Sequence, residues 1–270
     1  MPQIPGMATT APPDLDVARL RDAIRTTYER VALDPHGVFH FHRGREYAIE
    51  KLGYDRAELE ALPLEATERF AGVGNPLAIG PVHAGEVVLD HACGAGMDLL
   101  LAARRIGPHG RAIGVDLTAG MRRVASRAVH RAGLEDRVVI RAGSYDDLPV
   151  PSSSVDVVVS NGVVNLAPDK HRVFAEIWRV LRPGGRLYLA DVVVARELKL
   201  ETRRKAELWA ACIAGALPRR ELPLLAGQTG FVNVRLLDSF DCFAGTSAED
   251  KVSRDLHVQG LNFFAQKPIS

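Results

Sequence analysis

The sequence contains few cysteines and no C-x-x-C pair, which argues against a scaffold built on disulfides. Cys93, Cys212 and Cys242 are an odd number of thiols at wide spacing, and they fit a reducing, cytoplasmic setting. No apolar run approaches the ~20 residues that a membrane-spanning helix needs. The formal net charge is only +1, so bulk electrostatics do not favour binding to nucleic acid. We therefore expect a small-molecule partner, no nucleic acid and no membrane.

The length and composition are those of a globular chain with a sizeable core. Of the 270 residues, 47% are hydrophobic and 25% are charged. Residues 1–13 are rich in Pro, Ala and Thr and lack the pattern of a signal peptide, so we expect a disordered tail. Residues 14–80 show helical spacing and are expected to form a cap over a cofactor cleft. Residues 81–270 are expected to form the main domain.

One stretch, EVVLDHACGAGMDLL at residues 86–100, organises the rest of the chain. Residues 87–89 are apolar and rich in valine, which predicts a buried strand. The small residues at 91–96 predict a turn, and the Leu- and Ala-rich segment after them predicts a helix. A strand, a glycine turn and a helix together form the nucleotide-binding unit of an open α/β sheet, because glycine lets the backbone approach the ligand.

Details of this turn favour S-adenosylmethionine over a dinucleotide. The third glycine of G-x-G-x-x-G is missing after Gly94 and Gly96. Asp90 and Asp98 flank the turn with negative charge, which would repel a pyrophosphate. S-adenosylmethionine has no phosphate and carries an ammonium and a sulfonium group, which carboxylates bind through charge-assisted hydrogen bonds. A second predicted strand ends in Asp116, where a carboxylate could accept hydrogen bonds from both ribose hydroxyls.

The alternation of strands and helices predicts an α/β fold with a doubly wound, mostly parallel sheet of seven strands. The apolar run VDVVVS is typical of a central parallel strand. A long helix is expected over residues 201–216, and the last two strands are expected to form a hairpin at one edge. The predicted strands cover residues 87–90, 112–116, 138–141, 155–160, 186–194, 231–240 and 261–267.

Four sequence motifs follow one another along residues 80–194. They are Asp90-x-x-x-Gly94-x-Gly96, the acidic Asp116, the apolar strand at 155–160 and the run Leu-Arg-Pro-Gly-Gly at 181–185. In this order and spacing they resemble the motifs of class I S-adenosylmethionine-dependent methyltransferases. The resemblance implies a Rossmann-like fold with S-adenosylmethionine as cofactor. Ala92 replaces a glycine that is common in the first motif of the family.

Further segments carry a closer resemblance. They are A-G-V-G-N-P at 71–76, I-G-V-D-L-T at 113–118, S-N-G-V-V-N-L-A-P-D-K at 160–170 and C-I-A-G-A at 212–216. They resemble the arsenite methyltransferase subfamily. This resemblance implies that Asp116 holds the ribose and that Leu117 packs on the adenine. It also implies that Asp146 accepts a hydrogen bond from the adenine amino group and that Asn161 lies near the methionine end. The expected cofactor-binding residues are Asp90, Ala92, Gly94, Gly96, Asp116, Leu117, Tyr145, Asp146 and Asn161.

The arsenic-binding thiols of that subfamily are mostly missing. The subfamily binds trivalent arsenic through several thiolates, one of them directly after the Ser-Asn of the fourth strand, where this chain has Gly162. Another is expected near the N-terminus, but residues 1–92 contain no cysteine. Only Cys212 matches. Because the number of thiolates sets how tightly a soft ion is held, we expect slow or absent methylation of arsenite.

Three residues outside the cofactor turn are candidates for catalysis: Cys212, Tyr47 and His42. His42 belongs to an H-x-x-x-H-x-H pattern, but no Asp, Glu or Cys is placed to complete a metal site, so we expect histidines that line the cap and no metal. Tyr47 could contact the methionine end of the cofactor or the acceptor, or only pack. Cys212 could equally be a core residue, because free cysteine is often buried.

The sequence as a whole predicts an enzyme that transfers a methyl group from S-adenosylmethionine to a small-molecule acceptor by in-line displacement. Alignment of the nucleophile, the methyl group and the sulfur supplies much of the catalysis, so the lack of an evident general base is no obstacle. Two alternatives stay open. One is an arsenite methyltransferase that uses Cys212, and the other is a cofactor-binding protein without catalysis.

Overall fold

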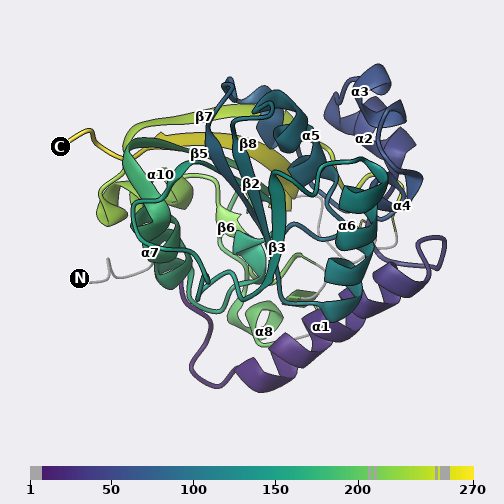
Figure 1. Ribbon diagram of the computed structural model, residues 1–270. Helices are drawn as coiled ribbons and strands as arrows, with labels where there is room; N and C mark the ends of the chain where they lie inside the picture. Colours follow the sequence, from purple (N-terminus) through teal and green to yellow (C-terminus); the bar gives the residue numbers. More distant parts are fainter. Residues whose placement is uncertain (1–7, 206–207, 210–211, 247–248, 250–255) are drawn as a thin grey trace.

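The computed structural model describes residues 8–205, 208–209, 212–246, 249 and 256–270. Figure 1 shows one twisted sheet at the centre of the molecule, with strand order β3-β2-β1-β4-β5-β8-β7 and with β6 paired to β5 off this path. Strands β1 to β6 pair in parallel, and β8 is antiparallel to both β5 and β7. The strands are β1 (Val87–His91), β2 (Arg111–Asp116), β3 (Val138–Ala142), β4 (Val155–Asn161), β5 (Leu181–Val194), β6 (Leu217–Pro218), β7 (Val232–Phe240) and β8 (Gln259–Gln266).

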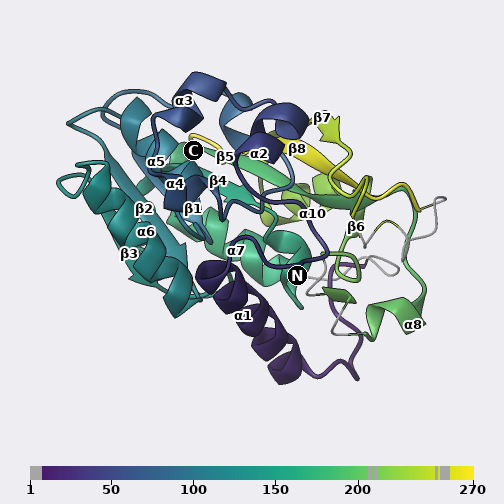
Figure 2. The same ribbon diagram turned by 90° about the vertical axis from the view of Figure 1, so that its right-hand side faces the viewer.

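Helices cover both faces of the sheet (Figures 1 and 2). Successive strand residues point to opposite faces, so Val88 packs in one core cluster with α5 and Leu89 packs in the other with α7. The helices are α1 (Val17–Leu33), α2 (Arg45–Leu52), α3 (Arg56–Glu60), α4 (Leu64–Thr67), α5 (Met97–Arg105), α6 (Ala119–Arg131), α7 (Lys170–Val180), α8 (Leu200–Arg203) and α10 (Glu221–Thr229). The predicted doubly wound, mostly parallel sheet is therefore confirmed, including the antiparallel strands at one edge. The prediction of seven strands missed the two-residue strand β6, which is too short to show a sequence pattern.

The predicted long helix over residues 201–216 is wrong. Helix α8 ends at Arg203, and Cys212 has a φ of 60°, which is outside the helical region. The chain around Gly215 packs tightly instead, because a Cβ built there would lie 1.8 Å from the carbonyl oxygen of Asn165. Residues 206–207 and 210–211 lie outside the described part of the chain. Local propensity favoured a helix here, and tertiary packing overrode it.

Residues 8–10 differ from the expected disordered tail. The backbone N–H of Ala8 donates to Glu221 Oε2 at 2.7 Å, and Thr10 forms an antiparallel bridge with Asp169. Ala8 and Thr9 are buried. The start of the described chain is therefore fixed beside α7 and α10 by hydrogen bonds that its composition does not reveal.

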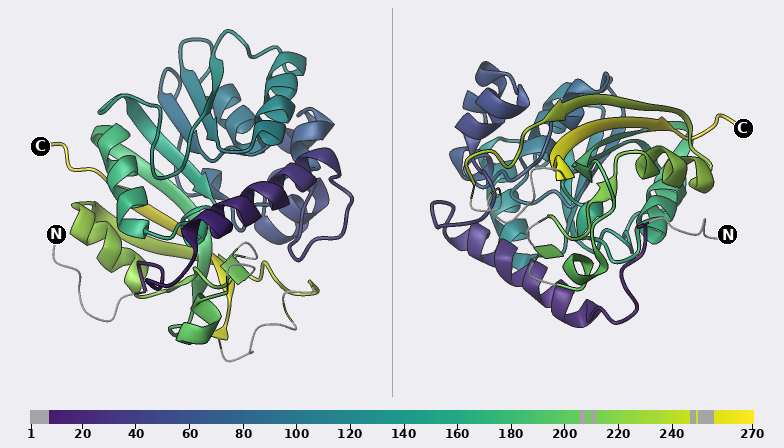
Figure 3. Two further views of the ribbon diagram at one scale, coloured as in Figure 1. Left: turned by 90° about the horizontal axis from the view of Figure 1, so that it is seen from below. Right: turned by 180° about the vertical axis from the view of Figure 1, so that it is seen from behind.

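Helix α1 crosses the end of the sheet and lies beside α6 (Figures 2 and 3). A separate apolar cluster forms the roof over this end, with Leu20 and Ile24 from α1 packing against Cys212 and Cys242. The roof therefore joins the N-terminal helix to two segments from the last quarter of the chain. Within the described residues, no helix combines the length and apolarity needed to span a membrane.

Candidate active site

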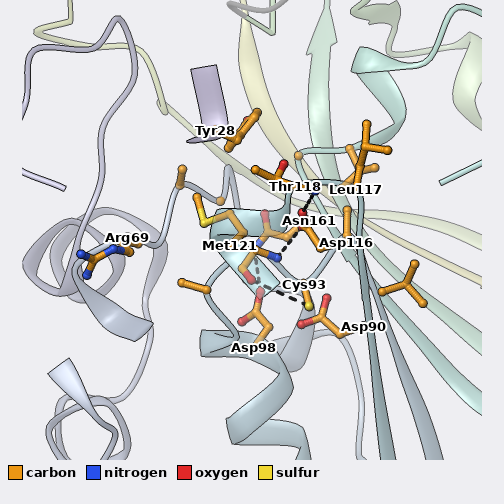
Figure 4. Close-up of a pocket in the computed structure, with 18 of the residues that line it drawn as sticks. Tyr28, Arg69, Asp90, Cys93, Asp98, Asp116, Leu117, Thr118, Met121 and Asn161 are labelled. Carbon is orange, nitrogen blue, oxygen red and sulfur yellow. Dashed lines mark hydrogen bonds between the residues drawn. The ribbon is translucent and has the colours of Figure 1, made fainter. Parts of the chain in front are cut away.

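A cleft of about 900 Å³, which includes its open mouth, lies where the parallel strands β1, β2 and β4 end. In open α/β sheets, ligands bind at this carboxyl edge. Ile24 and Tyr28 of α1 also line it, and Figure 4 shows Tyr28 on the side opposite the carboxylates. The lining includes seven of the nine predicted cofactor residues, namely Asp90, Ala92, Gly94, Asp116, Leu117, Tyr145 and Asn161.

The turn between β1 and α5 adopts a conformation that explains its small residues. Ala92, Gly94 and Gly96 have φ values of 66°, 52° and 93°, and this left-handed region favours glycine. Gly96 is the N-cap of α5, and the N–H of Gly94 donates to Asp116 Oδ2 at 2.9 Å. Gly96 does not line the cleft and acts through the turn. Ala92 adopts this conformation at a cost in free energy that a glycine would avoid.

Three carboxylates are buried around this turn: Asp90, Asp98 and Asp116 (Figure 4). Asp98 accepts hydrogen bonds from the Tyr54 hydroxyl at 2.7 Å and from Asn161 Nδ2 at 3.0 Å. Asp116 accepts from the N–H groups of Gly94 and Thr118, the latter at 2.7 Å. For Asp90 Oδ2, no donor is found among the described residues. The cluster thus keeps a carboxylate oxygen that can accept a hydrogen bond from a ligand.

Burial raises the pKa of all three carboxyl groups. The pKa of Asp98 rises to about 6, although hydrogen bonds from Tyr54 and Asn161 and the charge of Arg105 oppose the shift. The pKa of Asp90 rises well above its usual range because of burial, followed by repulsion from Asp98 and Asp116. Burial also raises the pKa of Asp116. A cationic ligand would relieve this repulsion and favour the ionised forms.

These residues fit S-adenosylmethionine. The buried Asp90 oxygen and Asp98 can accept hydrogen bonds from an ammonium group, and the three carboxylates attract a sulfonium. Arg69 is the one basic residue in the described lining, and its guanidinium donates to the backbone oxygens of Ala32 and Glu65. In Figure 4 Arg69 lies apart from the carboxylates. No basic side chain in this lining therefore neutralises the cluster in place of a ligand.

Asn161 ties the loop at residues 72–74 to this cluster. Its Nδ2 donates to Asp98 and to the oxygen of Gly74, and its Oδ1 accepts from the N–H of Val73 at 2.8 Å. A Cβ on Gly72 would lie 2.4 Å from Asn161 Nδ2, so the loop can approach only with glycine there. The A-G-V-G-N-P segment is thereby held against the site predicted for the methionine end.

Asp146 lies outside the described lining of the cleft, although the resemblance predicts that it binds the adenine. Its Oδ2 accepts from Arg21 of α1 at 2.8 Å, and its Oδ1 accepts from the Ser144 hydroxyl. Tyr145 lines the cleft, and the buried His91 reaches its backbone oxygen at 2.9 Å. The role of Asp146 toward adenine stays a prediction. In this structure its carboxylate instead forms an ion pair with Arg21 of α1.

A second, smaller chamber adjoins the cleft; its empty space, including its open mouth, is about 280 Å³. It brings together all three predicted catalytic residues, Cys212, Tyr47 and His42. The rings of Tyr47 and His42 stack with centroids 5.0 Å apart, and His42 Nε2 lies 2.6 Å from the oxygen of Ala244. Sequence reasoning missed Cys242, which also lines this chamber, because nothing local relates it to Cys212.

Tyr28 was not predicted as a site residue either, although the helical pattern that predicts α1 includes it. It lines both the cleft and the chamber, as do Ala71 and Gly72. The two spaces therefore share a wall made of one aromatic side chain and a loop of small residues. No group of three or more His, Cys, Asp or Glu residues that could hold a metal occurs in the part of the chain that the structure describes.

A family model described as "Methyltransferase domain" matches residues 82–251. The chain belongs to the methyltransferase family. Its sheet, its cleft at the carboxyl edge and its acidic turn are those of a class I S-adenosylmethionine-dependent member. The match covers the turn, the fourth strand and Cys212, and it ends before β8.

The proteins similar to this chain include several arsenite methyltransferases. The chain is 40% identical over 187 residues to an arsenite methyltransferase of Halobacterium salinarum, covering 69% of this chain and 47% of that protein. It is 34% identical to the human arsenite methyltransferase, and the match covers 67% of this chain and 50% of that protein. It thus spans about half the length of these curated relatives. Among solved structures, an arsenic(III) S-adenosylmethionine methyltransferase from Chlamydomonas reinhardtii matches with a TM-score of 0.68 and 33% identity, covering 79% of this chain and 72% of that one.

We predict that Ala92→Gly stabilises the protein by about 0.5–1 kcal/mol, because glycine adopts a φ of 66° without the clash of a Cβ. The free energy of unfolding from urea titrations would measure the change. Ala18→Gly on the exposed side of α1 is the matched control and should destabilise by about the same amount. Equal destabilisation by both substitutions would contradict the assigned turn strain.

We predict that S-adenosylhomocysteine, which carries the same ammonium group, binds more weakly as the pH falls. The pKa of Asp98 is raised to about 6, so acid protonates the cluster and removes its charge. Affinity should drop about fourfold from roughly pH 7.5 to pH 5.5 in isothermal titration. Asp98→Asn should bind more weakly near pH 7.5 and show a flatter pH dependence. A wild-type affinity that is constant over this range would refute the role of the carboxylates.

Proposed function

We propose that this protein transfers a methyl group from S-adenosylmethionine to a small molecule held in the second chamber. The observation that carries the proposal is the shared wall of Tyr28, Ala71 and Gly72 between the cofactor cleft and that chamber. A donor in the cleft and an acceptor in the chamber would face each other across this wall. Alignment of the two reactants is the main requirement for methyl transfer.

The size and lining of the chamber favour a small acceptor over a macromolecule. Its empty space is only about 280 Å³ even when the open mouth is included, and Phe41, Tyr47 and Phe243 surround it. Tyr47 is buried, and its hydroxyl donates to the oxygen of Gly72 at 3.2 Å. An extended peptide or a nucleic acid would not fit into such a space without displacing α1 or the roof.

His42 is placed to act on an acceptor that must lose a proton. When Nε2 donates to the oxygen of Ala244, Nδ1 is the ring nitrogen that remains as a base. A hydroxyl acceptor needs such a base, whereas a sulfur or arsenic nucleophile does not. The stack of His42 on Tyr47 holds the ring in the chamber wall.

The relatives favour a trivalent arsenic compound as the second candidate acceptor. They are named arsenite methyltransferases, and Cys212 lies in the chamber. Gly162, where the resemblance implies a further thiol, has a φ of 73°, so a cysteine there would be strained. A cofactor-binding protein without catalysis is the third reading, and turnover with any acceptor would eliminate it.

We propose a cytoplasmic location and no macromolecular partner. All three cysteines are free and buried, which suits a reducing compartment. The balanced net charge of +1 supports no preference for nucleic acid. Recovery of the native chain from a secreted or membrane fraction would contradict this location.

The direct test is release of S-adenosylhomocysteine from the purified protein in the presence of small thiols, hydroxylated metabolites and arsenite. Val73 lines the chamber but not the cleft, so Val73→Phe should fill the acceptor space. We expect kcat/KM for the acceptor to fall about tenfold or more, equivalent to at least about 1.4 kcal/mol, while affinity for S-adenosylhomocysteine stays within about twofold.

Val232→Phe is the matched control, because Val232 is 42% exposed on the edge strand β7 and far along the fold from the chamber. It should leave both quantities unchanged. Retained S-adenosylhomocysteine affinity in Val73→Phe also shows that the variant folds. Full activity of Val73→Phe would place the acceptor outside the chamber.

We also propose that residues 14–70 act as a lid that S-adenosylhomocysteine orders. Helix α1 is fastened to the other side of the cleft by Arg21 to Asp146 and by Glu29, which accepts from the N–H of Gly120 at 2.9 Å. Ligand contacts with Ile24 and Tyr28 would reinforce these bonds. Amide hydrogen exchange over residues 17–50 should slow when the ligand is bound. Identical exchange in both states would argue against a lid, and exchange in the edge strand β7, which does not line the cleft, serves as the internal control.

A further inference from the structure

Two of the three thiols share the second chamber. Cys212 lies in the chain after α8, and Cys242 lies directly after β7. Thirty positions separate them in the sequence. Both line the same space of about 280 Å³, and Cys212 lies near enough to raise the pKa of Cys242 by its charge. Cys93 lies in the cofactor turn and is not part of this lining.

The sulfur of Cys212 is held in place by its surroundings. The side chains of Tyr28 and Asn165 lie close to it, and both oppose the rise in the pKa of its thiol that burial causes. Cys212 has a φ of 60°, a conformation that side-chain-bearing residues adopt at a cost and that recurs where a side chain must be aimed. Tyr28 in turn lines the cofactor cleft. The thiol is thus fixed next to the wall between donor and chamber.

Both thiols are protonated at neutral pH. Burial raises the pKa of Cys212 to about 12, and burial followed by the charge of Cys212 raises the pKa of Cys242 far above its usual value. Asp191 and Asp241 lie near the two thiols, but neither lines the chamber, and no described lining residue is Asp, Glu, Lys or Arg. Apart from the imidazole of His42, the described lining is therefore uncharged, and it offers no anion to balance a cation.

These features select the chemical class of ligand. A divalent metal ion would have to lose its hydration shell and draw protons off both thiols in a space without compensating charge. A neutral trivalent arsenic centre that carries hydroxyl groups can instead condense with neutral thiols. Each thiol forms an As–S bond, its proton leaves with one hydroxyl as water, and arsenic stays trivalent. No charge is created and no oxidant is consumed.

We propose that Cys212 and Cys242 form a two-sulfur site in the second chamber that holds a neutral trivalent arsenical through loss of two water molecules. The site rests on the proposed function in that it names the acceptor class for the same chamber. It supplies the second thiol from the roof rather than from the end of β4, where Gly162 lies. Cys242 belongs to a different segment from every motif that carries the subfamily resemblance.

Phenylarsine oxide, whose hydrated form has two exchangeable hydroxyls, is the probe. Wild-type protein should bind one probe per chain with loss of two free thiols, measured by mass spectrometry and thiol titration. Cys212→Ser and Cys242→Ser should each bind about 100-fold more weakly, since one remaining bond loses the intramolecular advantage of the second. Cys93→Ser is the matched control and should retain the wild-type affinity for the probe.

Wild-type affinity in Cys242→Ser would overturn the proposal, as would loss of affinity in Cys93→Ser alone. Should Cys242→Ser fail to bind S-adenosylhomocysteine, and so fail to fold, alkylation of the wild type decides. The probe must then protect Cys212 and Cys242 but not Cys93, and any other pattern refutes the site. The binding assay contains no methyl donor, so failure of methyl transfer with every acceptor would overturn the proposed function separately.

Discussion

Three buried carboxylates at the carboxyl edge of β1 and β2 are the constraint on which the site depends. Burial disfavours the ionised forms of all three carboxyl groups, and repulsion adds to this at Asp90. The surrounding structure therefore has to supply hydrogen-bond donors to these buried groups. Backbone N–H groups serve Asp116, whereas Tyr54 and Asn161 serve Asp98. Tyr54 of the cap and Asn161 of the fourth strand are therefore both joined by hydrogen bonds to Asp98, one of the carboxylates proposed to attract the cofactor.

Backbone strain is placed at both ends of the site. Ala92 in the cofactor turn and Cys212 in the chamber both have positive φ values without being glycine. Such residues cost of order 1 kcal/mol each and persist only where the surrounding structure over-determines them. Here the surroundings are the β1–α5 turn and the packing of the segment around Gly215 against η2 (Val164–Leu166). The strained residues thus lie in the wall of the cleft, at Ala92, and in the wall of the chamber, at Cys212.

The roof joins three parts of the chain that lie far apart in the sequence. The cluster that contains Leu20, Ile24, Cys212 and Cys242 brings α1, the segment after α8 and the segment after β7 together above the end of the sheet. Tyr28 extends from this roof to the cofactor cleft. The acidic turn below and the thiol-bearing roof above thus meet at a wall that Tyr28 shares with Ala71 and Gly72.

The sheet, the acidic glycine turn and the place of Asp116 could be predicted from the sequence, because they depend on short-range patterns: apolar strands, small residues at a turn and an acid at a strand end. The sequence predicted a helix over residues 201–216 where packing around Gly215 prevails, and it could not relate Cys242 to Cys212. Only the tertiary structure decided that His42, Tyr47 and these two thiols share a chamber. The reason is topological: β8 inserts between β5 and β7, and this places the segment after β7 over the same strand ends as α1.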